Sequence, residues 1–189
     1  MVGGKSNMSR IGRLPIAIPA GVTVEVSNEN VVSVKGPLGT LSQEVCDCIT
    51  IEKQENTLVL TRKNEEKESR AKHGLYRALI ANMIEGVTKG FSKTLIINGV
   101  GYKCQVAGSK LTLNIGFSHP INVDIPSDLK VSCPSATEIK VEGCNKTTVG
   151  QFAADIKALK PIEPYHGYGI KYSDQFVLRK EIKKAAKKK

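Results

Sequence analysis

The sequence is poor in aromatic residues: Phe, Tyr and Trp make up 5% of its 189 residues, and tryptophan is absent. Large clefts walled by aromatic rings are therefore not expected. Long apolar runs are missing too, because the longest fall far short of the roughly 20 residues that a membrane-spanning helix needs. The first residues contain no apolar core of signal-peptide length. We therefore expect no membrane partner.

Cysteine is present in a number and spacing that exclude the common cysteine frameworks. The five residues are Cys46, Cys48, Cys104, Cys133 and Cys144. An odd count, wide spacing and no Cys-x-x-Cys pair argue against a disulfide framework and a zinc site. Cys46 and Cys48 alternate like strand neighbours, so we expect buried free thiols in a reducing compartment.

Recognisable catalytic motifs are also missing. The three histidines, His73, His119 and His166, stand in neither metal-ligand nor triad-like spacing. Residues 98–102 resemble half of a dinucleotide-binding motif, but the third glycine is absent and a strand pattern follows. Gly99 and Gly101 are better explained by a bulge or a close backbone approach. We expect no enzyme activity, no cofactor and no metal.

What the sequence does have is an excess of positive charge at its two ends. The whole chain has 28 Lys and Arg residues against 18 Asp and Glu residues, a net charge of +10. Residues 1–14 carry +3 and residues 179–189 carry +6, which leaves +1 for residues 15–178. Cationic termini of this kind become ordered on an anionic surface, and the phosphate backbone of a nucleic acid is the usual one.

The body of the chain contains an internal repeat. A shift of 80 positions aligns residues 22–61 with residues 102–141 without a gap, and both copies then reach a helix pattern. Segments 22–26, 31–35, 49–53 and 57–61 alternate apolar and polar residues, which predicts half-buried antiparallel strands.

Each copy ends in one predicted helix. Residues 65–85 form an amphipathic pattern with Asn64 as N-cap and Gly86 as stop, and a second helix starts near Asn145 or Thr147 and ends before Pro161. The predicted fold class is α+β: two tandem duplicated domains, each an antiparallel sheet packed with one helix, plus a basic C-terminal tail.

Residues 157–189 combine rings, glycines and lysines. Residues 161–172 hold two prolines, three tyrosines and a histidine, which suits either stacking on unpaired bases or a rigid connection packed on its own domain. The basic tail beside this loop favours RNA. We expect Tyr172 and Phe176 to pack, because they alternate in a strand-like segment.

Several motifs resemble one known family. They are Met8–Ile16, Lys35–Gly39, His73–Leu79, Gly99–Tyr102, Gly116–Pro120, and Pro164-Tyr165 with the glycines that follow. Together, in order over residues 8–184, they resemble the bacterial-type sixth protein of the large ribosomal subunit. The resemblance implies two duplicated α+β domains bound to large-subunit ribosomal RNA near the sarcin–ricin loop and the stalk base. It also implies neighbouring ribosomal proteins, translation GTPases docked nearby, and no catalytic role.

The resemblance divides the chain into a basic N-terminal extension (1–14), a first α+β repeat (15–88), a second repeat (89–165), and an RNA-binding loop with a basic tail (166–189). It implies that the second domain and the tail hold the RNA, which agrees with the equal numbers of bases and acids, ten each, in residues 15–99. The implied RNA contacts are Ser118, His119, Lys157, Lys160, Tyr165, His166, Gly167, Tyr168, Gly169, Lys171, Arg179, Lys180, Lys183, Lys184, Lys187, Lys188 and Lys189.

The chain departs from the family pattern at three of these positions. Lysines are usual where His166 and Tyr168 stand, so two phosphate interactions are either missing or replaced by stacking. Lys160 stands where an arginine is usual, which gives up the bidentate fork. The extra residues before Met8 and the cysteine count point to an organelle such as a plastid, with the bacterial cytoplasm as the alternative. A free-standing RNA-binding regulator and a peripheral membrane protein are the competing interpretations of function.

Overall fold

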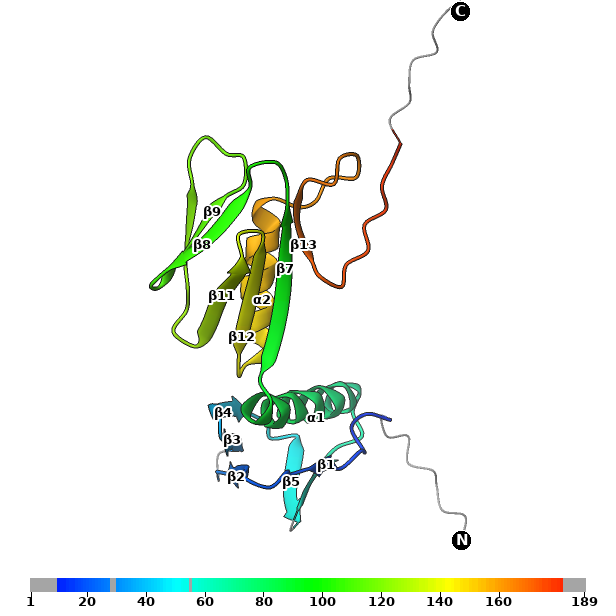
Figure 1. Ribbon diagram of the computed structural model, residues 1–189. Coiled ribbons are helices and arrows are strands. Elements are labelled where there is room, and N and C mark those ends of the chain that lie inside the picture. Colours follow the sequence, from blue (N-terminus) through cyan, green and yellow to red (C-terminus); the bar gives the residue numbers. More distant parts are fainter. Residues whose placement is uncertain (1–9, 28–29, 55, 182–189) are drawn as a thin grey trace, which may run out of the picture. The chain divides into compact units, whose positions relative to one another are not determined.

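The structure is a computed structural model, and it describes residues 10–27, 30–54 and 56–181. Contacts divide the chain into two compact units (Figure 1). The first comprises the chain up to Gly90 with Cys144–Lys146, and the second comprises Phe91–Gly143 with the chain from Thr147 onward. Within the described residues, no helix is both long and apolar enough to cross a membrane.

The first unit has two antiparallel three-stranded sheets and one long helix. The sheets have the strand orders β1-β6-β5 and β2-β3-β4. Its elements are β1 (Ile16–Ala17), β2 (Thr23–Val26), β3 (Val31–Gly36), β4 (Gly39–Glu44), β5 (Ile49–Gln54), β6 (Thr57–Arg62) and α1 (Lys67–Thr88).

The second unit repeats this order and adds one strand. Its sheets have the orders β10-β9-β8 and β11-β12-β7-β13, again with antiparallel neighbours, and β13 lies at the edge beside β7 (Figure 1). Its elements are β7 (Phe91–Asn98), β8 (Lys103–Ala107), β9 (Lys110–Asn114), β10 (Ile121–Asp124), β11 (Leu129–Ser135), β12 (Glu138–Gly143), α2 (Lys146–Leu159) and β13 (Gly169–Tyr172). The α+β class and the duplication are confirmed, although each repeat contains two sheets rather than one.

Each unit has its own aliphatic core between the sheets and the helix. In the second unit α2 contributes Val149, Phe152, Ala153 and Ile156, at the i, i+3, i+4, i+7 spacing that puts them on one face. The sheets meet this face with the buried residues of alternating strands, such as Ile139 in β12. Burial of each large aliphatic side chain stabilises the unit by roughly 1.5–3 kcal/mol.

The gap-free match at a shift of 80 positions agrees with the pairing of β2, β4 and β5 and is wrong by one residue in two other strands, β3 and β6. Val34, buried in β3, has Leu113 as its counterpart in β9, an offset of 79. Leu60, buried in β6, has Val141 as its counterpart in β12, an offset of 81. A one-residue slip would turn every side chain of a strand to the other face. Burial of the apolar residues in the core therefore determines which residues of the two units correspond, and the turns differ in length by one residue to allow it.

The helix boundaries also differ from the prediction. Helix α1 begins at Lys67 after Glu66, and no side-chain hydrogen bond caps it, so Asn64 is not its N-cap. Gly86 lies inside the helix rather than at its stop. The extra residues bury Val87 against Gly36, where an added Cβ would lie 2.7 Å from Val87 Cγ2. In the second unit, Asn145 directly precedes α2 and Thr147 lies within it.

The cysteines are free, as expected, but two of them are placed differently from the prediction. Cys46 and Cys48 do not alternate on a strand; they lie in the turn between β4 and β5, which the Ile49 amide closes by donating to the Cys46 carbonyl at 3.0 Å. Both are half-buried, whereas Cys104 is buried. A turn forms here instead of a strand because the flanking residues Val45 and Ile49 occupy the core positions.

Candidate nucleic-acid interface

The C-terminal end of α2 presents Lys157 beside an aromatic ring. Burial of Ile156 against the sheet fixes the last turn of the helix, and Lys157 follows directly. Its ammonium nitrogen lies 4.7 Å from the centroid of the Tyr172 ring in β13. Lys93 approaches the same ring at 5.6 Å and also lies 3.6 Å from an Asp174 carboxylate oxygen. Cation–π contacts hold both lysines in place; Asp174 already pairs with Lys93, whereas the contact with Tyr172 leaves the charge of Lys157 available to an anion.

Lys160 lies over two further rings. Its ammonium nitrogen is 5.6 Å from the Tyr102 ring centroid and 5.0 Å from that of Phe117. Two glycines make room for Tyr102: an added Cβ on Gly99 would lie 2.4 Å from Tyr102 Cδ2, and one on Gly116 would lie 2.9 Å from its hydroxyl oxygen. The group that approaches Gly99 closely is thus a side-chain ring, whereas nothing lies within 4 Å of a Cβ added to Gly101, which has φ +76°. Gly99 and Gly116 therefore leave the space that the Tyr102 ring occupies, and the ring in turn contacts the Lys160 ammonium group.

Ser118 and His119 follow Phe117 on the segment between β9 and β10. Both are exposed, and the Ser118 hydroxyl oxygen lies 3.4 Å from His119 Nδ1. Phe117 itself is 47% exposed although it touches Lys160. Ser118 and His119 thus directly follow Phe117, whose ring contacts Lys160.

The loop between α2 and β13 is held rigidly at its base. The Ile170 amide donates to the Lys160 carbonyl at 2.8 Å, and the Glu163 amide donates to the Tyr168 carbonyl at 2.9 Å. Gly169 has φ +133°, and an added Cβ would lie 2.6 Å from the Pro161 carbonyl oxygen. Only glycine fits at position 169, where the two ends of the loop pass close to each other.

The tip of the loop exposes flat rings. His166 and Tyr168 stack with centroids 5.5 Å apart and an interplanar angle of 13°. His166 Nδ1 lies 3.0 Å from a Glu163 carboxylate oxygen. Tyr165 is 50% exposed and Tyr168 is 40% exposed. The loop therefore has a packed base, as a rigid connection would, and exposed rings; base stacking by these rings stays a prediction.

The first residues of the tail lie against this loop. The Lys180 amide donates to the Pro164 carbonyl at 2.9 Å, and an added Cβ on Gly167 would lie 3.0 Å from Arg179 Nη2. The half-buried Lys171 lies in β13, paired with Ile96 of β7. Of the predicted contacts, Lys183, Lys184, Lys187, Lys188 and Lys189 lie outside the described residues.

One packing prediction in this region is wrong. Tyr172 is half-buried against the second core, as expected, but Phe176 is 86% exposed. The strand pattern does not continue to Phe176 because β13 ends at Tyr172, where the Gln175 amide donates back to the Tyr172 carbonyl at 3.1 Å.

We call Lys157, Lys160, Tyr102, Phe117, Tyr172 and the loop 161–168 the lysine–aromatic surface. Sequence reasoning named both lysines and the loop but did not assign Tyr102, Phe117 or Tyr172 to the site. The available signal for Tyr102 was the nearby Gly99, since an interior glycine often marks a close approach to the backbone.

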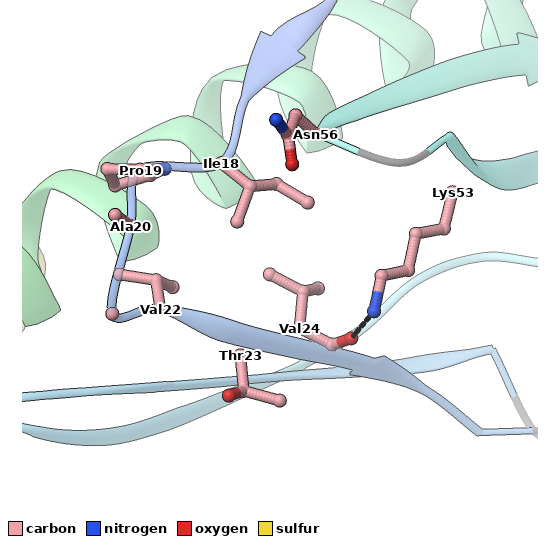
Figure 2. Close-up of a pocket in the computed structure, with 9 residues that line it drawn as sticks. Ile18, Pro19, Ala20, Val22, Thr23, Val24, Lys53 and Asn56 are labelled. Atoms are coloured by element: carbon pink, nitrogen blue, oxygen red, sulfur yellow. Dashed lines mark hydrogen bonds between the residues drawn. The ribbon is translucent and has the colours of Figure 1, made fainter.

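The first unit contains a separate hollow of a different character (Figure 2). Nine residues line it, and Lys53 is the one with a titratable side chain. The Lys53 ammonium donates to the Val24 carbonyl at 3.0 Å, so a backbone group already holds it. Within the described residues, no group of three or more His, Cys, Asp and Glu side chains could hold a metal ion.

A cationic and aromatic surface on the second of two repeated α+β units is a feature typical of nucleic-acid-binding proteins. A family model described as Ribosomal protein L6 matches residues 18–90 and 98–173. The chain belongs to this ribosomal protein family, which confirms the sequence-based assignment. The family is a structural component of the ribosome and not an enzyme, as predicted.

Bacterial relatives named large ribosomal subunit protein uL6 match nearly the whole chain. The protein from Clostridium kluyveri is 49% identical over 180 residues, 95% of this chain and 100% of the relative. That from Clostridium perfringens is 51% identical over 176 residues, covering 93% and 98%. That from Dictyoglomus turgidum is 49% identical over 181 residues, covering 96% and 100%.

Proposed function

We propose that the chain is a structural constituent of the large ribosomal subunit and binds large-subunit ribosomal RNA through its second unit. The observation that carries this proposal is the lysine–aromatic surface in a chain of the ribosomal protein L6 family. Lysines held over rings offer positive charge to phosphates, and exposed rings offer faces to unpaired bases.

The RNA-contacting residues we propose are those inferred from the sequence, and they divide by role. Lys157, Lys160 and Lys171 contact phosphates, as do Arg179 and Lys180 at the base of the tail. Tyr165 and the stacked pair of His166 and Tyr168 contact bases, so that stacking replaces the two phosphate interactions of the usual lysines. Gly167 and Gly169 are buried, and they contribute by shaping the loop, because both have a positive φ that favours glycine.

We further propose that this attachment lies near the sarcin–ricin loop and the stalk base, beside the docking site of translation GTPases. The family resemblance is the support for this location. Hydroxyl-radical cleavage from iron tethered to Ser118→Cys or Tyr165→Cys, in a chain whose five native cysteines are replaced by alanine, tests it, because cleavage should fall in those two RNA elements. Cleavage confined to distant RNA helices would overturn the location while leaving RNA binding intact.

The compartment is either a bacterial cytoplasm or an organelle such as a plastid. The relatives described above are bacterial, which favours the bacterial cytoplasm. Fractionation of the source cells, followed by detection of the chain in cytosolic or organellar ribosomes, distinguishes the two.

The experiment that tests the proposed function compares matched lysine variants in RNA binding. Replacement of Lys157 and Lys160 by glutamine removes two charges that neutralise phosphates, so the slope of log K against log [salt] should become shallower by about 1.4. The control replaces Lys110 and Lys130, exposed lysines of the same unit, and should leave the slope unchanged. Equal slopes for both pairs would contradict the proposed surface.

A free-standing regulator is distinguished by the stability of its attachment. A structural constituent should co-sediment with the large subunit through a high-salt wash, whereas a regulator should dissociate.

A further inference from the structure

The first unit holds a cluster of two thiols and a lysine that the RNA-binding role does not use. Cys46 and Cys48 lie in the turn between β4 and β5, and Lys72 lies on α1. The Lys72 ammonium nitrogen is 3.6 Å from Cys46 Sγ, close enough to donate a hydrogen bond to sulfur. It also pairs with Glu68 at 2.6 Å. The structure thus places an ammonium group directly against a half-buried thiol.

The two thiols of this cluster differ in acidity. Hydrogen bonds from the Cys48 backbone and thiol, with the nearby charge of Lys72, lower the pKa of Cys46 below its ordinary value. Burial raises the pKa of Cys48 above its ordinary value, and the adjacent Cys46 thiol raises it further. Cys46 is therefore the better nucleophile, with a protonated thiol hydrogen-bonded beside it.

The second unit supplies an internal contrast. Cys104 in β8 and Cys133 in β11 also form a hydrogen-bonded pair, but Cys104 is buried. Burial raises the pKa of Cys104 to about 12 and raises the pKa of Cys133. The same chain thus contains one thiol pair suited to reaction and one suited to remaining reduced.

We propose that Cys46 is a modification site for hydroperoxides, activated by Lys72, and that Cys48 resolves the oxidised product into a Cys46–Cys48 disulfide. The arrangement matches the usual requirements of a redox-sensitive cysteine: thiolate character, access from solvent and a resolving thiol close by.

The reaction balances in two steps. The Cys46 thiolate attacks the distal oxygen of the hydroperoxide; an S–O bond forms, the O–O bond breaks, and the departing alkoxide takes a proton to leave as an alcohol. Cys46 is now a sulfenic acid. Cys48 sulfur then attacks Cys46 sulfur; the S–S bond forms, the S–O bond breaks, and hydroxide leaves as water with the Cys48 proton.

The test treats the full-length chain with hydrogen peroxide near pH 7 and maps its peptides by mass spectrometry. The expected first product is a peptide containing residues 46–48 that has lost two hydrogens. Cys48→Ser should stop at the sulfenic acid, which dimedone traps on Cys46, and Cys46→Ser should prevent both products. First oxidation at Cys104, Cys133 or Cys144 would overturn the proposal.

The role of Lys72 is tested by rate. Lys72→Gln should slow alkylation of Cys46 by iodoacetamide at least about threefold, because the fraction of thiolate falls. Lys67→Gln, at the exposed start of the same helix, is the matched control and should not change the rate. If the two variants react equally fast, Lys72 does not activate Cys46.

Discussion

Alanine in place of Gly99 tests whether glycine positions the ring that supports Lys160. The added Cβ would lie 2.4 Å from Tyr102 Cδ2, about 1 Å short of ordinary carbon–carbon contact. The backbone of Gly99 is not in the left-handed region, so the cost comes from the ring alone. Overpacking of this kind destabilises by about 1–3 kcal/mol.

The assay is urea unfolding followed by far-UV circular dichroism, in two backgrounds. In the otherwise unchanged chain, Gly99→Ala should lower the free energy of unfolding by about 1–3 kcal/mol. In a Tyr102→Ala background the same change should cost less than about 0.5 kcal/mol, because the obstructing ring is gone. Gly99→Ala should also weaken RNA binding, since Lys160 loses its support.

Gly101→Ala is the matched control for this series. Gly101 has φ +76° and nothing lies within 4 Å of an added Cβ, so alanine there costs about 1–2 kcal/mol of backbone strain in both backgrounds. If Gly99→Ala costs the same with and without the Tyr102 ring, the ring is not held against Gly99 and the positioning argument fails.

Four further predictions follow from other parts of the molecule. Deletion of residues 179–189 should weaken RNA binding and flatten its salt dependence, by about 0.7 in slope for each phosphate that is no longer neutralised; an unchanged slope would remove the tail from the interface. Tyr165→Ala should cost about 1–3 kcal/mol of RNA binding, measured by filter binding, and little stability, because the ring is half exposed. Gly169→Ala should destabilise the second unit in thermal melts by more than Gly101→Ala does, because it combines a positive φ with a Cβ 2.6 Å from backbone. Stability should fall as pH rises between about 9 and 12, because burial raises the pKa of Cys104 from 9.0 to about 12 and the unfolded chain therefore loses its proton first; Cys104→Ala should reduce this fall in urea titrations.

Much of the fold could be predicted because its strands are half-buried. Alternation of apolar and polar residues placed β2, β3, β5 and β6 correctly. It missed β4, whose sequence Gly39–Glu44 contains Leu41 as its one large apolar residue, and the two-residue β1. The end of α1 was wrong because contact between Val87 and Gly36, far apart in sequence, extends the helix beyond Gly86.

The site could be predicted in composition but not in geometry. The family resemblance singled out Lys157 and Lys160, and residue types singled out the loop that follows. The contacts that orient them join segments far apart in the sequence, as when Lys160 meets Tyr102 across 58 positions. Local patterns contain no information on such contacts. The stacking of His166 on Tyr168 was equally invisible, because it occurs in a loop that the hydrogen bond from the Glu163 amide to the Tyr168 carbonyl closes.

The central claim is that the second unit attaches the chain to ribosomal RNA through the lysine–aromatic surface. An electron cryo-microscopy structure of the large ribosomal subunit containing this chain tests it most directly. Our account predicts RNA phosphates within about 4 Å of the Lys157 and Lys160 ammonium groups and a base against the Tyr165 ring. RNA contacts confined to the first unit, with the lysine–aromatic surface open to solvent, would contradict it.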